Sequence, residues 1–181
     1  MYPVATERLE LRPFVESDLD GLYDMQRRPE VARYLFWEAR SREETRVALA
    51  AKLAVTTLTA EGDHLCLAVV HRESGRLVGD FQLEWLSGGH HRAEIGFVMN
   101  PDHAGRGYAT EAGREMLRLG FEVYGFHRIV GLCDGKNTPS MRLMARLGMR
   151  REAYFVQSEM FKGEWTDLAV YAMLRDEWLR G

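Results

Sequence analysis

The segment NPDHAGRGYATEAGREMLRLGFEVYG, residues 100–125, constrains the fold of this chain more than any other. Gly105 and Gly107 flank one arginine, and an uninterrupted helical pattern follows at once. The first turn of a helix has unpaired N–H groups and a partial positive charge, and glycine lets a phosphate approach them without a Cβ in the way. The segment therefore predicts a phosphate site at a helix start or, equally well, a tight turn from a strand into a helix.

Other phosphate-binding loops fit this segment less well. It lacks the GK[ST] sequence of a nucleoside-triphosphate loop, and GRGYAT has no third glycine at the GxGxxG spacing. Nucleotide binding through the same loop is therefore a less favoured alternative.

Hydrophobic periodicity predicts alternating strands and helices around this segment. The strands are expected over residues 5–14, 65–72, 77–86, 93–99, 127–134, 149–161 and 164–174. The helices are expected over residues 18–28, 45–58, 108–124 and 138–148. Hairpin strands followed by strand–helix–strand crossovers predict a mixed α/β fold, in which helices pack on a mixed sheet. The length of 181 residues favours one domain, residues 1–181.

Three helix starts have a capping residue of a favoured type. Ser17 is expected to cap the first helix, and Ser41 with Glu44 three residues later forms a capping-box pattern. Thr138 is the expected N-cap of the last helix, with a proline following it and Gly148 closing the end.

Composition and charge exclude several function classes. The formal net charge of −3 argues against a general nucleic-acid binder. No apolar run approaches a membrane span, and charges interrupt the N-terminal segment where a secretory leader needs an apolar core, so a soluble cytoplasmic protein is expected. Cys66 and Cys133 lack CxxC spacing and are expected to be buried free thiols. His90 and His91 are adjacent in a loop and predict a solvated turn, with no metal site.

The motifs GRGYATEA and NTPS…LG carry a family resemblance. Residues 93–149 resemble the central part of GNAT N-acetyltransferases, and TERLELRPFVESDLDGLYDM and MRREAYFVQSEMFKGEWTDLAVYAML are similar to the Rim-type branch, named for ribosomal-protein N-terminal acetylation. The resemblance covers nearly the whole chain. It implies a GNAT fold with a strongly twisted mixed sheet of about seven strands, helices on both faces and splayed central strands. It also implies transfer of an acetyl group from acetyl-CoA to an amine.

The resemblance assigns the cofactor to three segments. The diphosphate would bind backbone N–H groups of about Ala104 to Ala109, and the strand before them would bind the pantetheine arm. The residues assigned to acetyl-CoA are Phe97, Val98, Met99, Ala104, Gly105, Arg106, Gly107, Tyr108, Ala109, Thr110, Asn137 and Ser140. Asp102 departs from the Gln or Arg that the family often has at its position. An acid there would weaken diphosphate binding unless its side chain turns away or caps the helix.

Glu94 and Ser140 are the candidate catalytic residues. Amide formation needs a neutral amine, and an amine with a pKa of about 10.4 needs a base more than an N-terminal amine at about 7.7–8.0. Glu94 matches the catalytic glutamate of some protein-lysine acetyltransferases, or else it is an exposed strand residue paired with Arg92 or Arg128. Met144 stands where many members have a proton-donating tyrosine, and the resemblance gives Ser140 the role of bonding the sulfur. Asn137 and Ser140 also suit helix initiation alone.

The acceptor side is the least determined part. Phe36 and Trp37, in the aromatic stretch of residues 33–41, line the acceptor mouth or pack beneath their loop, and Trp85 and Tyr154 are weaker candidates that also suit the core. The acceptor would be a protein N-terminus or a small amine. An idle acyl-CoA-binding module that acts through a partner is the alternative function. The edge of the final hairpin is a candidate surface for a homodimer.

Overall fold

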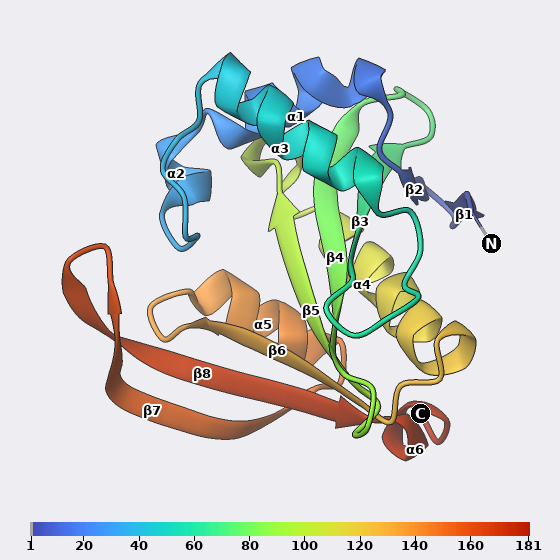
Figure 1. The fold of residues 1–181 in the computed structure, drawn as a ribbon, viewed down its shortest axis with the longest axis vertical. Helices are drawn as coiled ribbons and strands as arrows, with labels where there is room; N and C mark the ends of the chain where they lie inside the picture. The colour runs from blue at the N-terminus through green and yellow to red at the C-terminus, as the bar shows by residue number, and fades with distance from the viewer. Residues whose placement is uncertain (1) are drawn as a thin grey trace.

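The computed structural model describes residues 2–181, which contain one eight-stranded sheet in the order β1-β2-β3-β4-β5-β6-β8-β7 (Figure 1). Neighbouring strands are antiparallel except β5 and β6, which are parallel. The strands are β1 (Val4–Ala5), β2 (Leu9–Pro13), β3 (His64–His71), β4 (Leu77–Ser87), β5 (Arg92–Met99), β6 (Arg128–Asp134), β7 (Arg150–Phe161) and β8 (Glu164–Leu174). The sheet is therefore mixed, with its one parallel pair at the centre.

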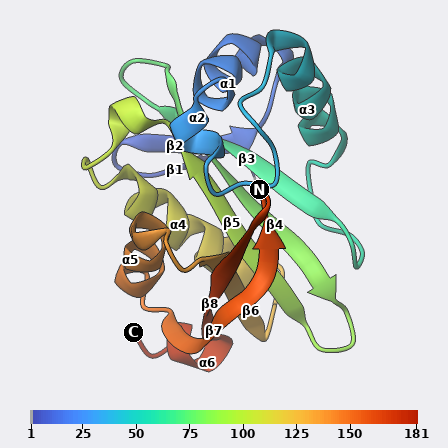
Figure 2. The ribbon, with the colours of Figure 1, turned by 90° about the vertical axis from the view of Figure 1, so that its left-hand side faces the viewer.

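Helices cover both faces of the sheet (Figure 2). The helices are α1 (Leu19–Gln26), α2 (Pro29–Ala32), α3 (Arg42–Ala54), α4 (Tyr108–Arg118), α5 (Thr138–Arg146) and α6 (Arg175–Trp178). Helices α1 and α3 lie on one face, and α4 and α5 lie on the other. A turn of wider helix, Leu119–Val123, extends α4. The mixed α/β architecture expected from the sequence is confirmed.

The core consists of two layers because side chains alternate along the strands. Leu65, Leu67 and Phe81 point to the α4 side and belong to the larger cluster. Cys66 and Ala68 point to the opposite side, where they pack with apolar residues of α1 and α3. Cys66 is buried as expected, whereas Cys133 is only half-buried.

The two central strands separate along their length. Strands β5 and β6 pair only at three positions of β5, namely Arg92, Ala93 and Glu94. Beyond this point β6 continues to pair with β8, while residues 95–99 of β5 pair only with β4. The expected splay is therefore present, and it leaves one side of the β5 backbone without a strand partner.

The N-terminal region differs from the sequence-based expectation. The strand expected over residues 5–14 is divided into β1 and β2, which pair with each other, so the sheet has eight strands and not seven. Ser17 does not cap the first helix, because a tight turn over Glu16–Asp18 precedes α1. The Asp18 carboxylate makes no capping bond to α1 either; it closes the preceding turn by accepting from the Val15 N–H at 2.9 Å, and it accepts from Arg12 at 2.7 Å.

Of the other three capping predictions, two are confirmed and one is wrong. The Ser41–Glu44 capping box is confirmed, since the Ser41 Oγ accepts from the Glu44 N–H and the Glu44 carboxylate accepts from the Ser41 N–H. The N-cap of α5 is Asn137 and not Thr138, because the Asn137 Oδ1 accepts from the Ser140 N–H at 3.2 Å. Gly148 closes α5 with a φ of +86°, as expected.

Residues 2–181 contain neither a membrane-spanning helix nor a cluster of metal-binding side chains. No helix in this range is both long enough and apolar enough to span a membrane. Within the same residues, no three His, Cys, Asp or Glu side chains are grouped so that they could hold a metal ion.

Candidate active site

The loop between β5 and α4 positions the predicted phosphate site. It begins with a tight turn over Pro101–His103, which the Asn100 side chain caps by accepting from the Asp102 N–H at 3.1 Å. Gly105 and Gly107 then adopt φ values of +74° and +82°. These left-handed conformations suit glycine, and Gly107 is the N-cap of α4. The glycines thus direct the chain into the helix with its N–H groups exposed.

Five consecutive backbone N–H groups at this loop have no acceptor within residues 2–181. They belong to residues 105–109, whereas the Ala104 N–H donates to the Pro101 carbonyl at 3.0 Å and the Thr110 N–H donates to the Gly107 carbonyl at 3.1 Å. The free donors therefore start one residue later than expected. A run of free N–H groups at a helix N-terminus is suited to bind an anion. We call residues 105–109 the phosphate seat.

A cavity of about 590 Å³ adjoins the phosphate seat. Its walls come from α2 and the residues after it, the end of β5, the loop and the start of α5. The predicted cofactor residues on its walls are Phe97, Val98, Met99, Ala104, Gly105, Gly107, Tyr108, Ala109, Thr110, Asn137 and Ser140. Arg106 is the exception: its guanidinium donates to the Asp102 carbonyl at 3.4 Å, and the residue lines a neighbouring polar cavity. The structure therefore brings together residues from three separate segments of the chain.

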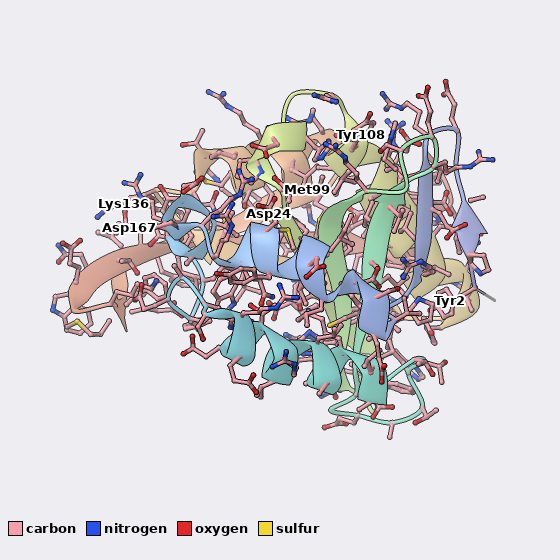
Figure 3. All side chains as sticks on the ribbon, turned by 90° about the horizontal axis from the view of Figure 1, so that it is seen from above. Tyr2, Asp24, Met99, Tyr108, Lys136 and Asp167 are labelled. Carbon is pink, nitrogen blue, oxygen red and sulfur yellow. The ribbon has the colours of Figure 1, made fainter. Side chains whose placement is uncertain are left out.

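The Asp102 carboxylate is paired with an arginine, and Asp102 does not line the cavity. Arg28, at the junction of α1 and α2, donates to both Asp102 carboxylate oxygens, at 2.8 and 2.7 Å. This pairing holds the pKa of Asp102 below its usual range. Arg28 also contacts Asp24 at 3.0 Å, and Figure 3 labels Asp24 on α1 and Met99 at the end of β5. The acid that the sequence placed near the diphosphate site thus has a cationic partner.

The start of α5 brings Ser140 to the cavity. The Asn137 cap fixes the first turn, and the Ser140 Oγ forms no hydrogen bond with any residue that the structure describes. Met144, at the position of the family tyrosine, is 1% exposed and packs over Gly131 in the core. The Ser140 hydroxyl is therefore free to donate to a group in the cavity.

Glu94 lies on the β5 face that points toward the α1 side of the sheet. It is half-buried and stands directly opposite Glu84 of β4. Burial and the facing Glu84 carboxylate raise the pKa of Glu94, Arg92 lowers it, and the net pKa is about 7. Neither Arg92 nor Arg128 forms an ion pair with Glu94, and Arg128 pairs with Glu152 instead. Glu94 is not on the wall of the cavity but three residues before Phe97 on the same strand.

The predicted acceptor residues lie at several places around the sheet. Phe36 is 91% exposed and contacts Phe161 edge-on at 5.5 Å, and the Trp37 ring lies under the Arg40 guanidinium at 4.5 Å. Neither lines the cavity. Trp85 packs on Phe126 in the large core cluster, on the opposite sheet face from Glu94, and the Tyr154 hydroxyl donates to Asp167 at 2.8 Å.

Nine residues of the cavity wall were not predicted from the sequence, namely Glu30, Val31, Tyr34, Leu35, Pro101, His103, Pro139, Leu143 and Arg146. The four-residue helix α2 is too short for its periodicity to be recognised. Arg146 could have been predicted from the sequence. Ser140, Leu143 and Arg146 follow an i, i+3, i+6 spacing that places them on one helix face. Its Nε donates to the Thr110 hydroxyl at 3.3 Å, so its positive charge lies beside the start of α4.

Comparison with known proteins identifies the family. Residues 8–150 match the family model described as Acetyltransferase (GNAT) domain. The chain is 34% identical over 176 residues to YnaD, an uncharacterized N-acetyltransferase of Bacillus subtilis (strain 168), and the match covers 97% of this chain and 98% of that protein.

Solved structures agree with this assignment. The acetyltransferase (GNAT family) from Bacillus anthracis superimposes with a TM-score of 0.87 and 32% identity, covering 97% of this chain and 100% of that one. Spermidine N-acetyltransferase from Vibrio cholerae, solved in complex with CoA and spermine, shares the fold with a TM-score of 0.80 at 20% identity, covering 96% and 99% of the two chains. The chain therefore belongs to the GNAT family of N-acetyltransferases.

Proposed function

We propose that this protein transfers the acetyl group of acetyl-CoA to a primary amine by direct attack in a ternary complex. The observation that carries the proposal is the phosphate seat, five free N–H groups at the mouth of a 590 Å³ cavity that follows the splayed end of β5. An anionic head group at the seat would place an attached arm along the unpaired side of β5.

The residues of this chain fit coenzyme A. An added Cβ at Gly105 would meet no atom within 4 Å, so the space in front of the seat is open, and its φ excludes most other residues. The cavity walls beyond the seat include the apolar residues Val31, Phe97 and Leu143, which suit the pantetheine arm. Acetyl-CoA, when bound, supplies the thioester that the amine attacks.

Strand β5 would orient the thioester. The backbone groups of residues 95–99 that face β6 have no strand partner, because the two strands pair only up to Glu94. These groups can hydrogen-bond the pantetheine amides, and one N–H can stabilise charge on the thioester oxygen. The splay therefore provides binding and electrostatic stabilisation from the same strand.

Glu94 would accept the proton of the amine, either directly or through a water molecule. Its raised pKa of about 7 makes it a better base near neutral pH than an ordinary glutamate. The distance along β5 between Glu94 and the cavity wall favours a relay through water. The free hydroxyl of Ser140 would donate a hydrogen bond to the sulfur as the thiolate forms.

The acceptor in this proposal is a primary amine of a protein N-terminus or of a small molecule. The Rim-type resemblance of the chain supports the first. We also propose that two copies of the chain pair through the outer edge of β7, the terminal strand of the sheet, where Phe155, Val156 and Met160 are exposed.

The test is to follow free CoA thiol after mixing the protein, acetyl-CoA and a panel of amines and N-terminal peptides. The proposal predicts thiol release that depends on both protein and amine, with an acetylated product of matching mass. CoA binding without turnover on any amine would contradict it and would favour a module that only binds acyl-CoA.

A further inference from the structure

Two carboxylates flank the phosphate seat, and an arginine from a distant part of the chain holds each of them. Asp102 lies three residues before the seat, and Glu111 lies two residues after it in the first turn of α4. Arg28 and Arg8 are their partners. The two arginines belong to separate segments, because Arg28 follows α1 whereas Arg8 precedes β2.

The Glu111 carboxylate has all of its contacts with the N-terminal segment. Its Oε2 accepts from the Arg8 Nε at 2.8 Å and lies 2.6 Å from the Arg8 Nη2. Its Oε1 accepts from the Arg8 backbone N–H at 2.9 Å and from the Thr6 hydroxyl at 2.5 Å. These contacts lower the pKa of Glu111, so it is ionised at neutral pH. The carboxylate is therefore saturated by donors from Thr6 and Arg8, and Glu111 does not line the cavity.

Arg8 also contacts the phosphate seat itself. Its Nη1 donates to the Arg106 carbonyl at 2.9 Å, and its guanidinium lies 5.0 Å from the centre of the Tyr108 ring. A Cβ added to Gly107 would lie 3.3 Å from the Arg8 Nη2. Arg8 thus engages a carbonyl of the seat, which keeps that acceptor from competing with an anion for the N–H groups.

An unpaired carboxylate at either position would oppose anion binding. The partial positive charge of the α4 N-terminus acts only over the first turn, and one nearby negative charge is enough to offset it. Each arginine binds its carboxylate through two guanidinium nitrogens, so a positive charge lies at hydrogen-bonding distance from Glu111 and from Asp102.

We propose that Arg8 and Arg28 are positioning residues that neutralise Glu111 and Asp102, so that the phosphate seat accepts the diphosphate of coenzyme A. This inference rests on the proposed function, because it concerns the same site. In this proposal neither Arg8 nor Arg28 contacts coenzyme A itself.

The test is calorimetric titration of CoA into wild type and into the variants Arg8→Met and Arg28→Met. We expect each variant to bind CoA about ten-fold more weakly than wild type at low salt, and the difference to shrink when salt is raised to about 500 mM. Arg8→Lys, which keeps the charge, should retain most of the affinity.

Two further sets of variants separate charge from structure. Adding Glu111→Gln to Arg8→Met, or Asp102→Asn to Arg28→Met, should recover most of the lost affinity because it removes the exposed carboxylate. The controls are Arg72→Met, since Arg72 donates to the Thr6 carbonyl at 2.7 Å, and Arg27→Met, since Arg27 pairs with Asp24 at 2.9 Å. Neither control residue contacts Glu111 or Asp102, so both variants should bind CoA like wild type.

The outcomes separate this inference from the proposed function. Absence of CoA binding by wild type would remove the proposed function and this inference with it. Tight binding by wild type that is unchanged in both arginine variants would overturn the inference alone. If adding Glu111→Gln or Asp102→Asn lowers the affinity for CoA further, the inference is also overturned. The arginines would then act only by stabilising the local structure.

Discussion

Glu94 of β5 stands directly opposite Glu84 of β4 on the same face of the sheet, and neither carboxylate forms an ion pair within residues 2–181. Two carboxylates in register across neighbouring strands repel each other when both are ionised. This relationship, together with burial, accounts for the raised pKa of Glu94.

The proposed base role predicts a specific pH profile. Below a pH of about 7 Glu94 binds a proton and cannot accept another, so kcat/KM should fall by about ten-fold per pH unit as the pH decreases. Initial rates across pH with a low-pKa amine would show this limb. Glu94→Gln should lower the plateau and remove the limb, and a Gln variant with the wild-type profile would exclude Glu94 as the base.

The same carboxyl should make stability depend on pH. Its folded pKa of about 7 exceeds the ordinary value of 4.5, so the native state binds more protons than the unfolded state between these values. The contribution of Glu94 to the free energy of unfolding should therefore decrease as pH rises from about 4.5 to 7. Urea denaturation at several pH values should show a shallower decrease for Glu94→Gln than for wild type. Equal slopes would mean that the pKa is not raised.

Gly107→Ala should weaken CoA binding. The φ of +82° is unfavourable for alanine by about 1–2 kcal/mol, and the added Cβ would lie 3.3 Å from the Arg8 Nη2, so the seat must shift. Gly62→Ala is the matched control, because Gly62 has a φ of +90° and no atom within 4 Å of its added Cβ. Both variants should lose similar stability in thermal unfolding, and only Gly107→Ala should lose affinity for CoA.

Ser140→Ala should reduce kcat without changing stability. The hydroxyl would donate to the thiolate as it forms, and loss of a hydrogen bond to a charged group costs about 1.5–3 kcal/mol, or roughly ten- to one-hundred-fold in rate. Its Oγ contacts no polar atom of residues 2–181, so the melting temperature should stay the same. A variant with unchanged kcat would leave Ser140 with only a helix-start role.

Much of the fold could be predicted because local signals and periodicity coincide. The strand over residues 65–72 and the Ser41–Glu44 box depend on neighbours in sequence, and both appear in the structure as expected. Asn137 and not Thr138 is the N-cap, because both residue types can cap a helix, asparagine more strongly, and the turn geometry selects between the two neighbours.

The parts that could not be predicted depend on contacts between distant segments. Arg28 reaches Asp102 across 74 residues of sequence, and Arg8 reaches Glu111 across 103. No spacing rule links such pairs. Phe36 and Trp37 were candidates for the acceptor mouth or for packing beneath their loop, and Tyr34, which lines the cavity, was not singled out, because the direction of a loop side chain depends on tertiary packing.

Lys52→Met should destabilise the fold by about 3–5 kcal/mol, because it leaves Asp80 as an uncompensated buried charge. The Lys52 Nζ lies 2.5 Å from the Asp80 Oδ2, and the two side chains are 12% and 5% exposed. Among residues 2–181 the Asp80 Oδ1 has no hydrogen-bond partner, so this carboxylate depends on the lysine. Denaturant unfolding would measure the loss. Adding Asp80→Leu should restore part of it, and a further loss would contradict the explanation.

The most direct test of the central claim is an NMR titration of the ¹⁵N-labelled protein with CoA. The account predicts saturable shifts that are largest for the amide signals of residues 105–109, the phosphate seat, while the Ala104 amide, already bonded to Pro101, moves less. Binding of CoA that leaves the five seat amides unshifted, or no binding at all, would contradict it.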